Sequence, residues 1–507
     1  MKKENSKIRN IVYAFLIITL CVVSSCKDNI LTSENTECSN TSTTRAIQSY
    51  FPFMKGVDLS YANELEDLGI KFYEDSIPKD IYQLMNNHGA NLARIRLWHN
   101  PTWTNYSNLK DAKKSISRAK SLNMYVLLDF HYSDTWTDPQ QNYIPAAWLP
   151  VIDDLDVLSD SVYQYTYNTL DHLYKSKLLP DWVQIGNEIN KNIMVRDTTE
   201  LLPVNLVRNV KLLSAGIKAV HHFNADFDTN IQTVLHVAMA PEESMEWVGN
   251  LTRLGIEDFD IFGLSYYPQW QGYTPKDLGV LTKNMRDTYH KKLLVAETGH
   301  IWTRQWNDTL INLMSKMGPG YPECPCPQLQ KDFLIEVRNE VRYNGGAGVI
   351  AWEPEWVSTP NQVTLWGAGS NWENVAFFDF NNNLIQPGGI DFLSEENAEV
   401  TFRVDMTNID TSNGVYITGE FTKGDWDQWQ FFPMKQEGNS SIYYFKTNLS
   451  LGQTGAYYYL NAADWNAKES IPKSCQLKWE DRLYEIPNNT KSMIISNVWS
   501  SCETTFE

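Results

Sequence analysis

The feature of this chain that most constrains its fold is a series of short apolar runs, each followed by a longer amphipathic segment. The eight runs cover residues 56–60, 92–97, 125–131, 182–188, 233–239, 261–267, 293–297 and 348–353. Helix-like segments lie between them at 81–88, 111–122, 161–177 and 206–223. Strands that alternate with helices favour a parallel sheet. Eight such units predict a (β/α)8 barrel with long loops, of the TIM type.

Nearly every apolar run ends in a polar or aromatic side chain. These terminal residues are Asp58, Arg96, His131, Glu188, Tyr266, Glu297 and Trp352. In a (β/α)8 barrel the active site is built at the C-terminal ends of the strands. We therefore expect these side chains to gather at one end of the barrel.

Two of the terminal residues are glutamates at the exits of apolar strands. Glu188 follows the run that starts at Trp182, and Glu297 closes the run that starts at Leu293. A carboxylate in such a place is poorly explained by packing, because burying a charge without partners is costly. For one glutamate alone, an exposed strand end explains the pattern equally well. The repetition favours a paired-carboxylate site.

A pair of carboxylates is the minimum apparatus for hydrolysis of a glycosidic bond. One must be protonated to expel the leaving oxygen, and the other must be ionised to attack the anomeric carbon or to activate water. Their surroundings have to separate their pKa values. Asn187 precedes Glu188 and offers an amide to a sugar hydroxyl. We assign Glu188 as the acid/base and Glu297 as the nucleophile.

Polar neighbours of the two acids are expected to adjust their ionisation. We expect Tyr266 to donate a hydrogen bond to Glu297 and to keep it ionised. Arg94 and Arg96 lie on one face of their strand by the two-residue period. One of them can lower the pKa of the nucleophile through its positive charge. The alternative for these arginines is ion pairing at the mouth of the barrel.

Other candidates for substrate contact are aromatic or polar. Trp352, Trp356, Trp366 and Trp372 lie close together in a polar, Gly-rich setting. Core packing and sugar contact are both open for them, and we count Trp352 and Trp366 with the substrate-binding residues. Asp58 is counted there too, as are Arg94, Arg96 and Asn187. For His131, a hydroxyl ligand and a buried structural histidine are both open.

Composition narrows the class of ligand. Trp, Tyr and Phe make up 13% of the 507 residues, which suits stacking on sugars, with a large aromatic core as the alternative. The formal net charge of −18 argues against a nucleic acid, because phosphate binding needs basic patches. The sequence contains no Cys/His metal motif, Gly-rich phosphate loop or nucleotide fingerprint.

The N-terminal residues 1–26 are expected to be a lipoprotein signal peptide. A basic start precedes an apolar stretch at 11–23, which suits an export signal and is too short to span a membrane. Val23-Ser-Ser-Cys26 looks like a bacterial lipobox with Cys26 as the lipidated residue; a plain cleaved signal peptide is the alternative. Lys27, in place of Asp, resembles outer-membrane sorting. Residues 27–46 predict a flexible tether, and surface display is expected.

Patterning changes again after residues 47–393, the expected catalytic domain. Residues 394–507 alternate at 399–404, 414–418 and 442–446 and lack helical patterning, which predicts a small all-β sandwich. The segment looks like a carbohydrate-binding sandwich, chiefly through 415–419 and 424–429. Trp426, Trp429 and Trp465 are candidate stacking platforms. An inert spacer is the alternative.

Cysteines are expected to serve structure. In an exported chain a disulfide is permitted, and we favour Cys475 with Cys502. Cys324-Pro-Cys326 is read as a structural loop rather than a redox or metal pair, because no His or further Cys stands near it in sequence.

The sequence resembles glycoside hydrolase family 53, the endo-β-1,4-galactanases, over about residues 55–380. The motifs that carry the resemblance are Gly56-Val-Asp58, Arg94-Ile-Arg96-Leu-Trp98, Asp129-Phe-His131-Tyr-Ser-Asp134-Thr-Trp136, Ile185-Gly-Asn187-Glu188, Leu264-Ser-Tyr266-Tyr267-Pro268, Ala296-Glu297-Thr298, Ala351-Trp352-Glu353-Pro-Glu355-Trp356 and Ser370-Asn-Trp372-Glu373-Asn374. The resemblance implies retaining endo-hydrolysis of β-1,4-galactan in the arabinogalactan side chains of pectin. It also implies Glu188 as acid/base and Glu297 as nucleophile, with carboxyls about 5–5.5 Å apart.

The same resemblance sets expectations for cofactors and partners. No cofactor is expected for catalysis. Several members bind calcium after the seventh strand, but residues 299–308 lack the Asp/His/Asn spacing. The expected partners are galactan and, through the lipid, a membrane, with the chain as a monomer. The alternatives are another retaining endo-β-glycanase (mannan, xylan or glucan) and a surface lipoprotein that binds glycan without cutting it.

Overall fold

A computed structural model describes residues 51–394, 397–422, 429–474, 481–487 and 490–506. The predicted signal peptide with Cys26, the predicted tether at 27–46, Trp426 and Cys475 lie outside the described residues. Among the described residues, no helix has the length and apolar character that crossing a bilayer requires.

Eight parallel strands close into a barrel, in the order β1-β10-β9-β8-β7-β6-β5-β4. They are β1 (Met54–Asp58), β4 (Leu92–Leu97), β5 (Tyr125–Phe130), β6 (Trp182–Ile185), β7 (Gln232–Val237), β8 (Ile261–Tyr266), β9 (Lys292–Thr298) and β10 (Gly348–Ala351). Each predicted apolar run overlaps one of these strands. The predicted barrel is therefore confirmed.

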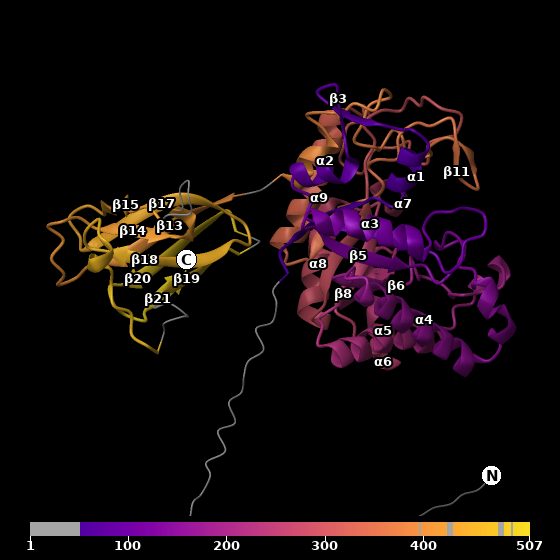
Figure 1. Cartoon of the computed structure of the whole chain (residues 1–507), viewed down its shortest axis with the longest axis horizontal. Coiled ribbons are helices and arrows are strands. Elements are labelled where there is room, and N and C mark those ends of the chain that lie inside the picture. The colour runs from indigo at the N-terminus through magenta and orange to yellow at the C-terminus, as the bar shows by residue number, and fades with distance from the viewer. Residues whose placement is uncertain (1–50, 395–396, 423–428, 475–480, 488–489, 507) are drawn as a thin grey trace, which may run out of the picture. The chain divides into compact units, whose positions relative to one another are not determined.

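Helices connect the strands and surround the barrel (Figure 1). They are α1 (Ala62–Asp67), α2 (Ile81–Asn87), α3 (Leu109–Ser121), α4 (Leu155–Lys175), α5 (Leu206–Phe227), α6 (Pro241–Arg253), α7 (Pro268–Gln271), α8 (Pro275–Tyr289) and α9 (Pro327–Tyr343). Polar side chains cap the N-terminal ends of several of these helices. At the start of α3 the Asn108 side chain accepts from the N–H of Lys110 and of Asp111. The apolar stripe of α5, with Val210, Leu213 and Ile217, is buried.

Smaller elements decorate the loops around the barrel. They are the hairpins β2 (Phe72–Glu74) with β3 (Ile77–Lys79) and β11 (Gln362–Thr364) with β12 (Gly367–Ala368), and the 3-10 helices η1 (Ala146–Val151), η2 (Thr198–Leu201) and η3 (Gly389–Leu393). Helix α4 begins six residues before the predicted segment, because Asp154 caps it by accepting from the N–H of Asp156 and of Val157.

The barrel interior changes character along its axis. Near the N-terminal ends of the strands an apolar cluster fills it, made up of Met54, Leu92, Leu127, Trp182, Val234, Ile261, Leu294, Ala296, Ala347 and Ile350. Two residues further along several strands, the residue on the same face is polar, as with Arg94 after Leu92 and Gln184 after Trp182. The apolar end closes the barrel, and the polar end holds the candidate site.

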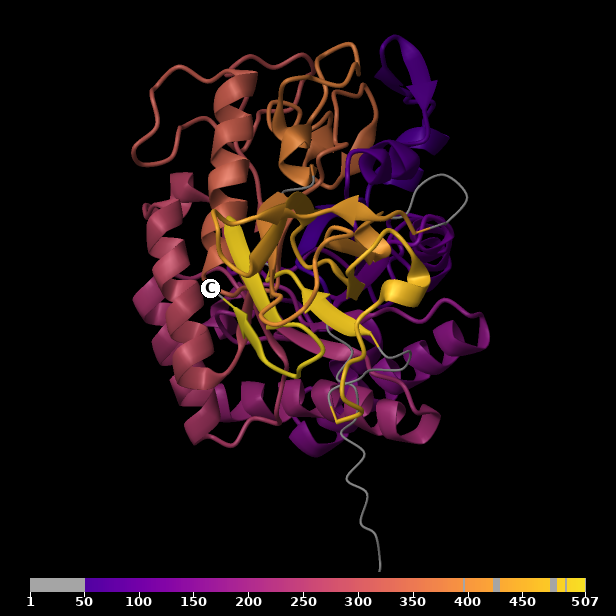
Figure 2. The same cartoon turned by 90° about the vertical axis from the view of Figure 1, so that its left-hand side faces the viewer.

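The C-terminal region is all-β, as predicted (Figure 1, Figure 2). One sheet has the order β16-β17-β13-β20-β21 and the other β15-β14-β18-β19. The strands are β13 (Asn397–Asp405), β14 (Tyr416–Gly419), β15 (Phe432–Pro433), β16 (Lys435–Gln436), β17 (Ile442–Ser450), β18 (Thr454–Leu460), β19 (Arg482–Glu485), β20 (Ser492–Val498) and β21 (Thr504–Phe506), with short 3-10 helices η4 (Glu420–Thr422) and η5 (Trp465–Ala467). Phe402, Tyr457, Tyr459, Tyr484 and Ile495 belong to the core of this region.

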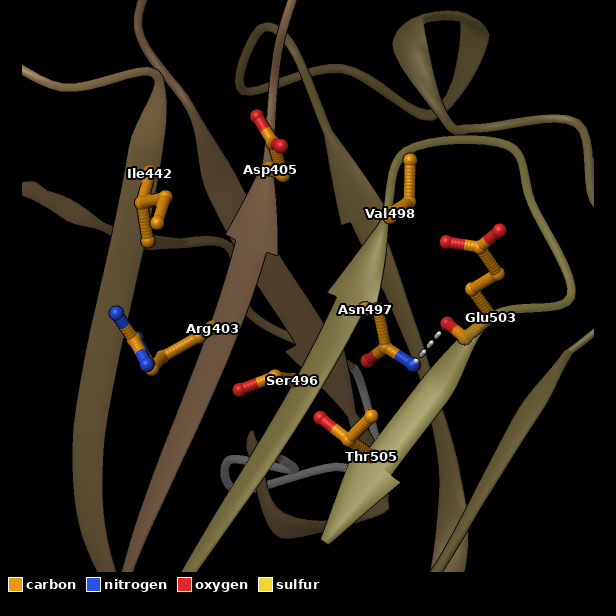
Figure 3. Close-up of a pocket in the computed structure, with 8 residues that line it drawn as sticks. All are labelled: Arg403, Asp405, Ile442, Ser496, Asn497, Val498, Glu503 and Thr505. Carbon is orange, nitrogen blue, oxygen red and sulfur yellow. Dashed lines mark hydrogen bonds between the residues drawn. The ribbon is translucent and has the colours of Figure 1, made fainter. Parts of the chain in front are cut away.

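A polar pocket lies on the outer face of the first of these sheets (Figure 3). Arg403 on β13, Ser496 on β20 and Thr505 on β21 stand side by side there, because they are paired across the three strands. Asn497 Nδ2 donates to the backbone oxygen of Glu503 at its edge, at 3.4 Å.

Candidate active site

The two candidate acids meet at the C-terminal end of the barrel. Glu297 lies in β9, opposite Ser265 of the neighbouring β8. Ser265 Oγ donates to Glu188 Oε1 at 2.6 Å. Glu188 itself comes three residues after β6 ends, in a turn where Gly186 has a φ of +85° and Glu188 a φ of +46°. A left-handed φ at a non-Gly residue is uncommon, and such strain is concentrated at functional sites.

Arg94 organises the base of the site. Its Nη1 donates to Glu297 Oε1 at 2.9 Å and to Asp58 Oδ2 at 2.7 Å. Its Nη2 donates to Asp129 Oδ2 and to Asn187 Oδ1, both at 2.8 Å. The guanidinium is buried, so these charge-assisted hydrogen bonds act with little screening by water. Of the two arginines considered from sequence, Arg94 is the one beneath Glu297.

The surroundings give the two acids different tendencies to ionise. Burial raises the pKa of Glu297, while the guanidinium of Arg94 opposes that rise. Removal from water raises the pKa of Glu188, and the negative charge of Glu297 raises it further. Glu297 has a direct cationic partner and Glu188 is held by a neutral hydroxyl. This asymmetry favours Glu297 as the ionised member and Glu188 as the protonated one.

The expectation that Tyr266 donates to Glu297 is wrong. Tyr266 Oη donates to the backbone oxygen of Tyr273 at 2.9 Å, and its ring stacks on Phe333. Its neighbour Tyr267 donates to Glu297 Oε2 at 3.3 Å. The reason is the two-residue period of the strand: Ser265 faces the barrel interior, so Tyr266 points to the helices. Applying that period to β8 would have found Ser265.

Asp58 has a different role from the predicted sugar contact. Its Oδ2 accepts from Arg94, and its Oδ1 accepts from the N–H and the hydroxyl of Ser60, at 3.1 and 2.5 Å. Asp58 is buried behind Arg94. It therefore holds the guanidinium in place instead of meeting a sugar hydroxyl.

His131 fits the structural alternative. Its Nδ1 accepts from the N–H of Thr137 at 3.2 Å, which places the ring hydrogen on Nε2, 3.0 Å from Asp129 Oδ2. Burial lowers the pKa of His131, so the ring is neutral at pH 7. Both ring nitrogens are occupied by protein partners. The predicted role as a hydroxyl ligand is not supported.

Asn187 faces the site next to Glu188. Its Oδ1 is fixed by Arg94, and its Nδ2 donates to the backbone oxygen of Thr137 at 2.7 Å. An amide nitrogen carries two hydrogens. Within the described residues only that one acceptor is recorded for Nδ2, which leaves the second N–H for a substrate oxygen.

Arg96 does not contact Glu297. It pairs with Glu353, with Nη1 to Oε1 at 3.1 Å, and its guanidinium lies 4.0 Å from the ring centre of Trp136. Tyr61 and Trp98 cover it further, with ring centres at 4.8 and 4.7 Å. The ion-pair alternative therefore describes Arg96, and the predicted sugar contact does not.

The four tryptophans separate into two groups. Trp356 and Trp372 are fully buried and belong to the core. Trp352 lies at the edge of the core, 9% exposed, and meets Trp372 edge-on at 4.8 Å. Trp366 is 46% exposed and stacks on Trp136 at 5.9 Å. Of the four, Trp366 offers the largest free ring surface to a ligand.

Sequence reasoning assigned no individual role to several residues of the site, although some of them stand in the family motifs. They are Asp129, Gln184, His236, Ser265, Tyr267, Trp136, Glu353 and Glu355. Gln184 Nε2 donates to Asp129 Oδ1 at 2.6 Å, and the His236 ring nitrogen Nε2 lies 2.9 Å from Ser265 Oγ. The inward positions of β5, β6 and β7 would have revealed Asp129, Gln184 and His236 by their two-residue spacing.

Calcium ligands are not arranged in the segment after β9. Asp308 there accepts from the N–H of Leu310, of Thr359 and of Ser370. His300 is buried and stacks on Phe333. Across the described ranges, no group of three or more His, Cys, Asp or Glu side chains is placed to hold a metal ion.

The described cysteines differ in their state. Cys324 and Cys326 are free thiols, the first exposed. Cys502 is disulfide-bonded, but Cys475 lies outside the described residues, so their pairing stays a prediction.

The chain is similar in sequence to known glycoside hydrolases. The sequence model of glycosyl hydrolase family 53 matches residues 54–387. An arabinogalactan endo-beta-1,4-galactanase from Cellvibrio japonicus is 43% identical over 331 residues, which cover 65% of this chain and 87% of that protein. An endo-beta-1,4-galactanase from Bacillus subtilis is 30% identical, covering 65% of this chain and 83% of that protein.

Two solved structures agree with the sequence relatives. The family 53 catalytic domain from Ignisphaera aggregans matches with a TM-score of 0.60 at 30% identity, over 68% of this chain and 95% of that one. One of two fungal beta-1,4-galactanases matches with a TM-score of 0.58 at 25% identity, over 68% and 99%. The family match covers the barrel strands and both candidate acids, and the chain therefore belongs to glycosyl hydrolase family 53.

Proposed function

We propose that this chain is a retaining endo-β-1,4-galactanase that cuts the galactan side chains of pectic arabinogalactan. The observation that carries the proposal is the pairing of Arg94 with Glu297 beside a second carboxyl, Glu188, which Ser265 holds. The relatives named as galactanases support the choice of substrate.

In the proposed mechanism Glu188 gives its proton to the glycosidic oxygen as the bond to the anomeric carbon breaks. The ionised Glu297 attacks that carbon, and a covalent glycosyl–enzyme forms. Glu188, now a carboxylate, then takes a proton from water, and the resulting hydroxide attacks the same carbon and releases Glu297. Two displacements at one carbon retain its configuration.

Neighbouring groups stabilise the charge on the nucleophile and contact the substrate. Arg94 and Tyr267 both donate to Glu297, which stabilises its ionised form before attack. The second N–H of Asn187 is available to a hydroxyl of the sugar that reacts. Trp366 offers a ring face to a neighbouring sugar.

Two other functions are open to a similar chain. A glycanase for mannan, xylan or glucan would need the same two acids, and the galactanase relatives weigh against it. A surface protein that binds glycan without cutting it has no use for two carboxyls with opposite ionisation, so the site weighs against that reading.

The test measures reducing-end release from β-1,4-galactan, with mannan, xylan and cellulose alongside, for the wild type and Glu188→Ala. We expect activity on galactan alone, lost in the variant. Activity on another polymer instead would overturn the substrate. No activity on any polymer with galactan binding retained would favour the capture protein.

We propose further that the chain is exported, lipidated at Cys26 and displayed on the outer membrane as a monomer. The residues 1–26 support it by their basic start, apolar stretch and terminal cysteine. Metabolic labelling with an alkyne fatty acid should mark the wild type and not Cys26→Ala. Label on both, or protection of the protein from protease added to whole cells, would contradict this proposal.

We also propose a glycan-binding surface on the C-terminal sheets. Tyr458 lies on the outer face of its sheet, because Tyr457 and Tyr459 face the core. The rings of Trp429 and Trp465 lie 5.8 and 6.0 Å from it, and Trp465 is 45% exposed. Aromatic rings gathered around an exposed tryptophan in this way suit a binding surface.

This aromatic surface suits a neutral sugar better than the polar pocket of Figure 3, where Arg403 and Asp405 line the wall. The test is retention of the full chain in galactan-containing gels, with Glu297→Gln to prevent cutting. Trp465→Ala should reduce retention several-fold, whereas Phe506→Ala, an exposed ring on the other sheet, should not. Equal retention of all three proteins would favour the inert spacer.

A further inference from the structure

A pair of buried glutamates that the proposed mechanism does not use follows β10. Glu353 and Glu355 are both fully buried, with Pro354 between them. Glu353 has a φ of +44°, in the left-handed region. Such a conformation costs about 1–3 kcal/mol at a non-Gly residue and persists only when the surroundings enforce it. The turn directs the Glu353 carboxyl back toward β1 and β4.

The two carboxyls have unequal partners. Glu353 Oε1 accepts from Arg96 Nη1 at 3.1 Å, and Oε2 accepts from the N–H of Tyr61 at 3.2 Å. Neither carboxyl oxygen of Glu355 has a hydrogen-bond donor among the residues that the structure describes. An ionised carboxylate buried without partners is far too costly to persist. A protonated carboxyl, by contrast, has one O–H to donate.

Arg96 is the cation that faces this pair. Its Nε donates to Ser107 Oγ at 3.1 Å, and its guanidinium is enclosed by the rings of Tyr61, Trp98 and Trp136. A desolvated guanidinium against aromatic faces is stabilised by cation–π contacts and needs a counter-charge. Glu353 supplies that charge directly.

The rings around Arg96 lead to the surface of the site. Trp136 lies 4.0 Å from the guanidinium and also stacks on the exposed Trp366. It also meets Trp352 at 6.0 Å. A displaced Arg96 would leave Trp136 without its support, and the orientation of Trp366 would change with it.

We propose that Glu355 keeps its proton and donates a hydrogen bond to Glu353, so that the pair carries one negative charge. This charge fixes Arg96 as the support of the aromatic wall formed by Trp136 and Trp366. Glu353 and Arg96 are thus positioning residues for substrate binding, two steps removed from the reacting atoms. The inference rests on the proposed function, because it takes a sugar to be what the wall binds.

The charges around the pair agree with a single shared proton. Burial raises the pKa of both carboxyls; the guanidinium of Arg96 opposes that rise at Glu353, whereas the adjacent Glu353 raises the pKa of Glu355 further. Asp58 and the partly desolvated Glu64 also face this cluster, with Arg96 as the opposing cation. A raised pKa in the folded protein means that the stabilisation is present at lower pH and is lost as the pH rises through that value.

The experiment compares two isosteric variants of the full chain, Glu353→Gln and Glu355→Gln. Gln at 355 stays neutral and keeps a donor toward Glu353, so KM for galacto-oligosaccharides should stay within about twofold of the wild type. Gln at 353 removes the charge that holds Arg96, and KM should rise about tenfold while kcat changes much less. A purely structural role would lower the folded fraction of both without this split.

A second measurement does not depend on folding of Glu353→Gln. Infrared spectra of the wild type at neutral pH should contain a protonated-carboxyl stretch that Glu355→Gln lacks. Absence of that difference, or an equal rise of KM in both variants, would overturn the inference. Failure of the proposed function would appear otherwise, as wild-type activity on another glycan, with the infrared difference unchanged.

Discussion

Nη1 of Arg94 lies 2.9 Å from Oε1 of Glu297, although the two residues come from strands that are not neighbours in the barrel, β4 and β9. The guanidinium spans the interior and also reaches Asn187, beside Glu188. One buried cation thus ties the ionisation of the nucleophile to the position of the amide next to the acid.

Arg94→Lys should therefore be a severe substitution. A lysine ammonium cannot reproduce the planar fork that serves Glu297, Asp58, Asp129 and Asn187 at once. We expect kcat to fall by about 100-fold or more, with the thermal unfolding midpoint measured alongside. A variant with wild-type kcat would show that Arg94 is not needed to prepare Glu297.

Tyr267→Phe and Tyr266→Phe form a matched pair. Loss of the Tyr267 hydroxyl removes a donor to Glu297, so kcat should fall roughly tenfold. Loss of the Tyr266 hydroxyl removes one bond to a backbone oxygen, so stability should fall by about 1 kcal/mol with kcat nearly unchanged. Steady-state kinetics and denaturant unfolding separate the two effects, and the reverse pattern would restore Tyr266 as the partner.

The pH dependence of kcat/KM should report the raised pKa of Glu188. The acid works when protonated, so activity is retained below its pKa and declines as the pH rises through it. The Ser265 hydroxyl favours the ionised form of Glu188 and thereby lowers its pKa. Ser265→Ala should consequently move the alkaline limb to higher pH. A shift to lower pH would contradict the assignment of Glu188 as the acid.

Trp366→Ala and Trp372→Ala should separate binding from stability. Trp372 is fully buried, and its truncation should cost about 3–5 kcal/mol of unfolding free energy. Trp366 is half exposed, so its truncation should leave stability within about 0.5 kcal/mol while raising KM several-fold. Unchanged KM in Trp366→Ala would remove that ring from the substrate path.

The barrel could be predicted from the sequence because the spacing of apolar residues and the polar residues that end each run are local properties of the chain. Every predicted run overlaps a strand, and the acids at the ends of β6 and β9 do meet at one end of the barrel. Spacing also placed Arg94 and Arg96 on the same face. These inferences needed only neighbours along the chain and the known geometry of the fold.

What the sequence left open depends on residues distant in the chain. Arg94 and Arg96 are equivalent by spacing, and the strands opposite them decide that the first meets Glu297 and the second Glu353. Asp58 and His131 look like free polar tips until their partners Arg94 and Asp129 are in place. Which of Tyr266 and Tyr267 reaches Glu297 depends on where β8 ends, and the strand ends at Tyr266.

The most direct test of the central claim, that Glu297 attacks the sugar and Glu188 delivers the proton, is covalent trapping. An activated 2-deoxy-2-fluoro-β-galactobioside should glycosylate the wild-type enzyme, and peptide mass spectrometry should find the label on Glu297. Glu188→Ala should still be labelled, because an activated leaving group needs no protonation. Label on another residue, or no label together with an inverted product, would contradict the two-carboxylate assignment.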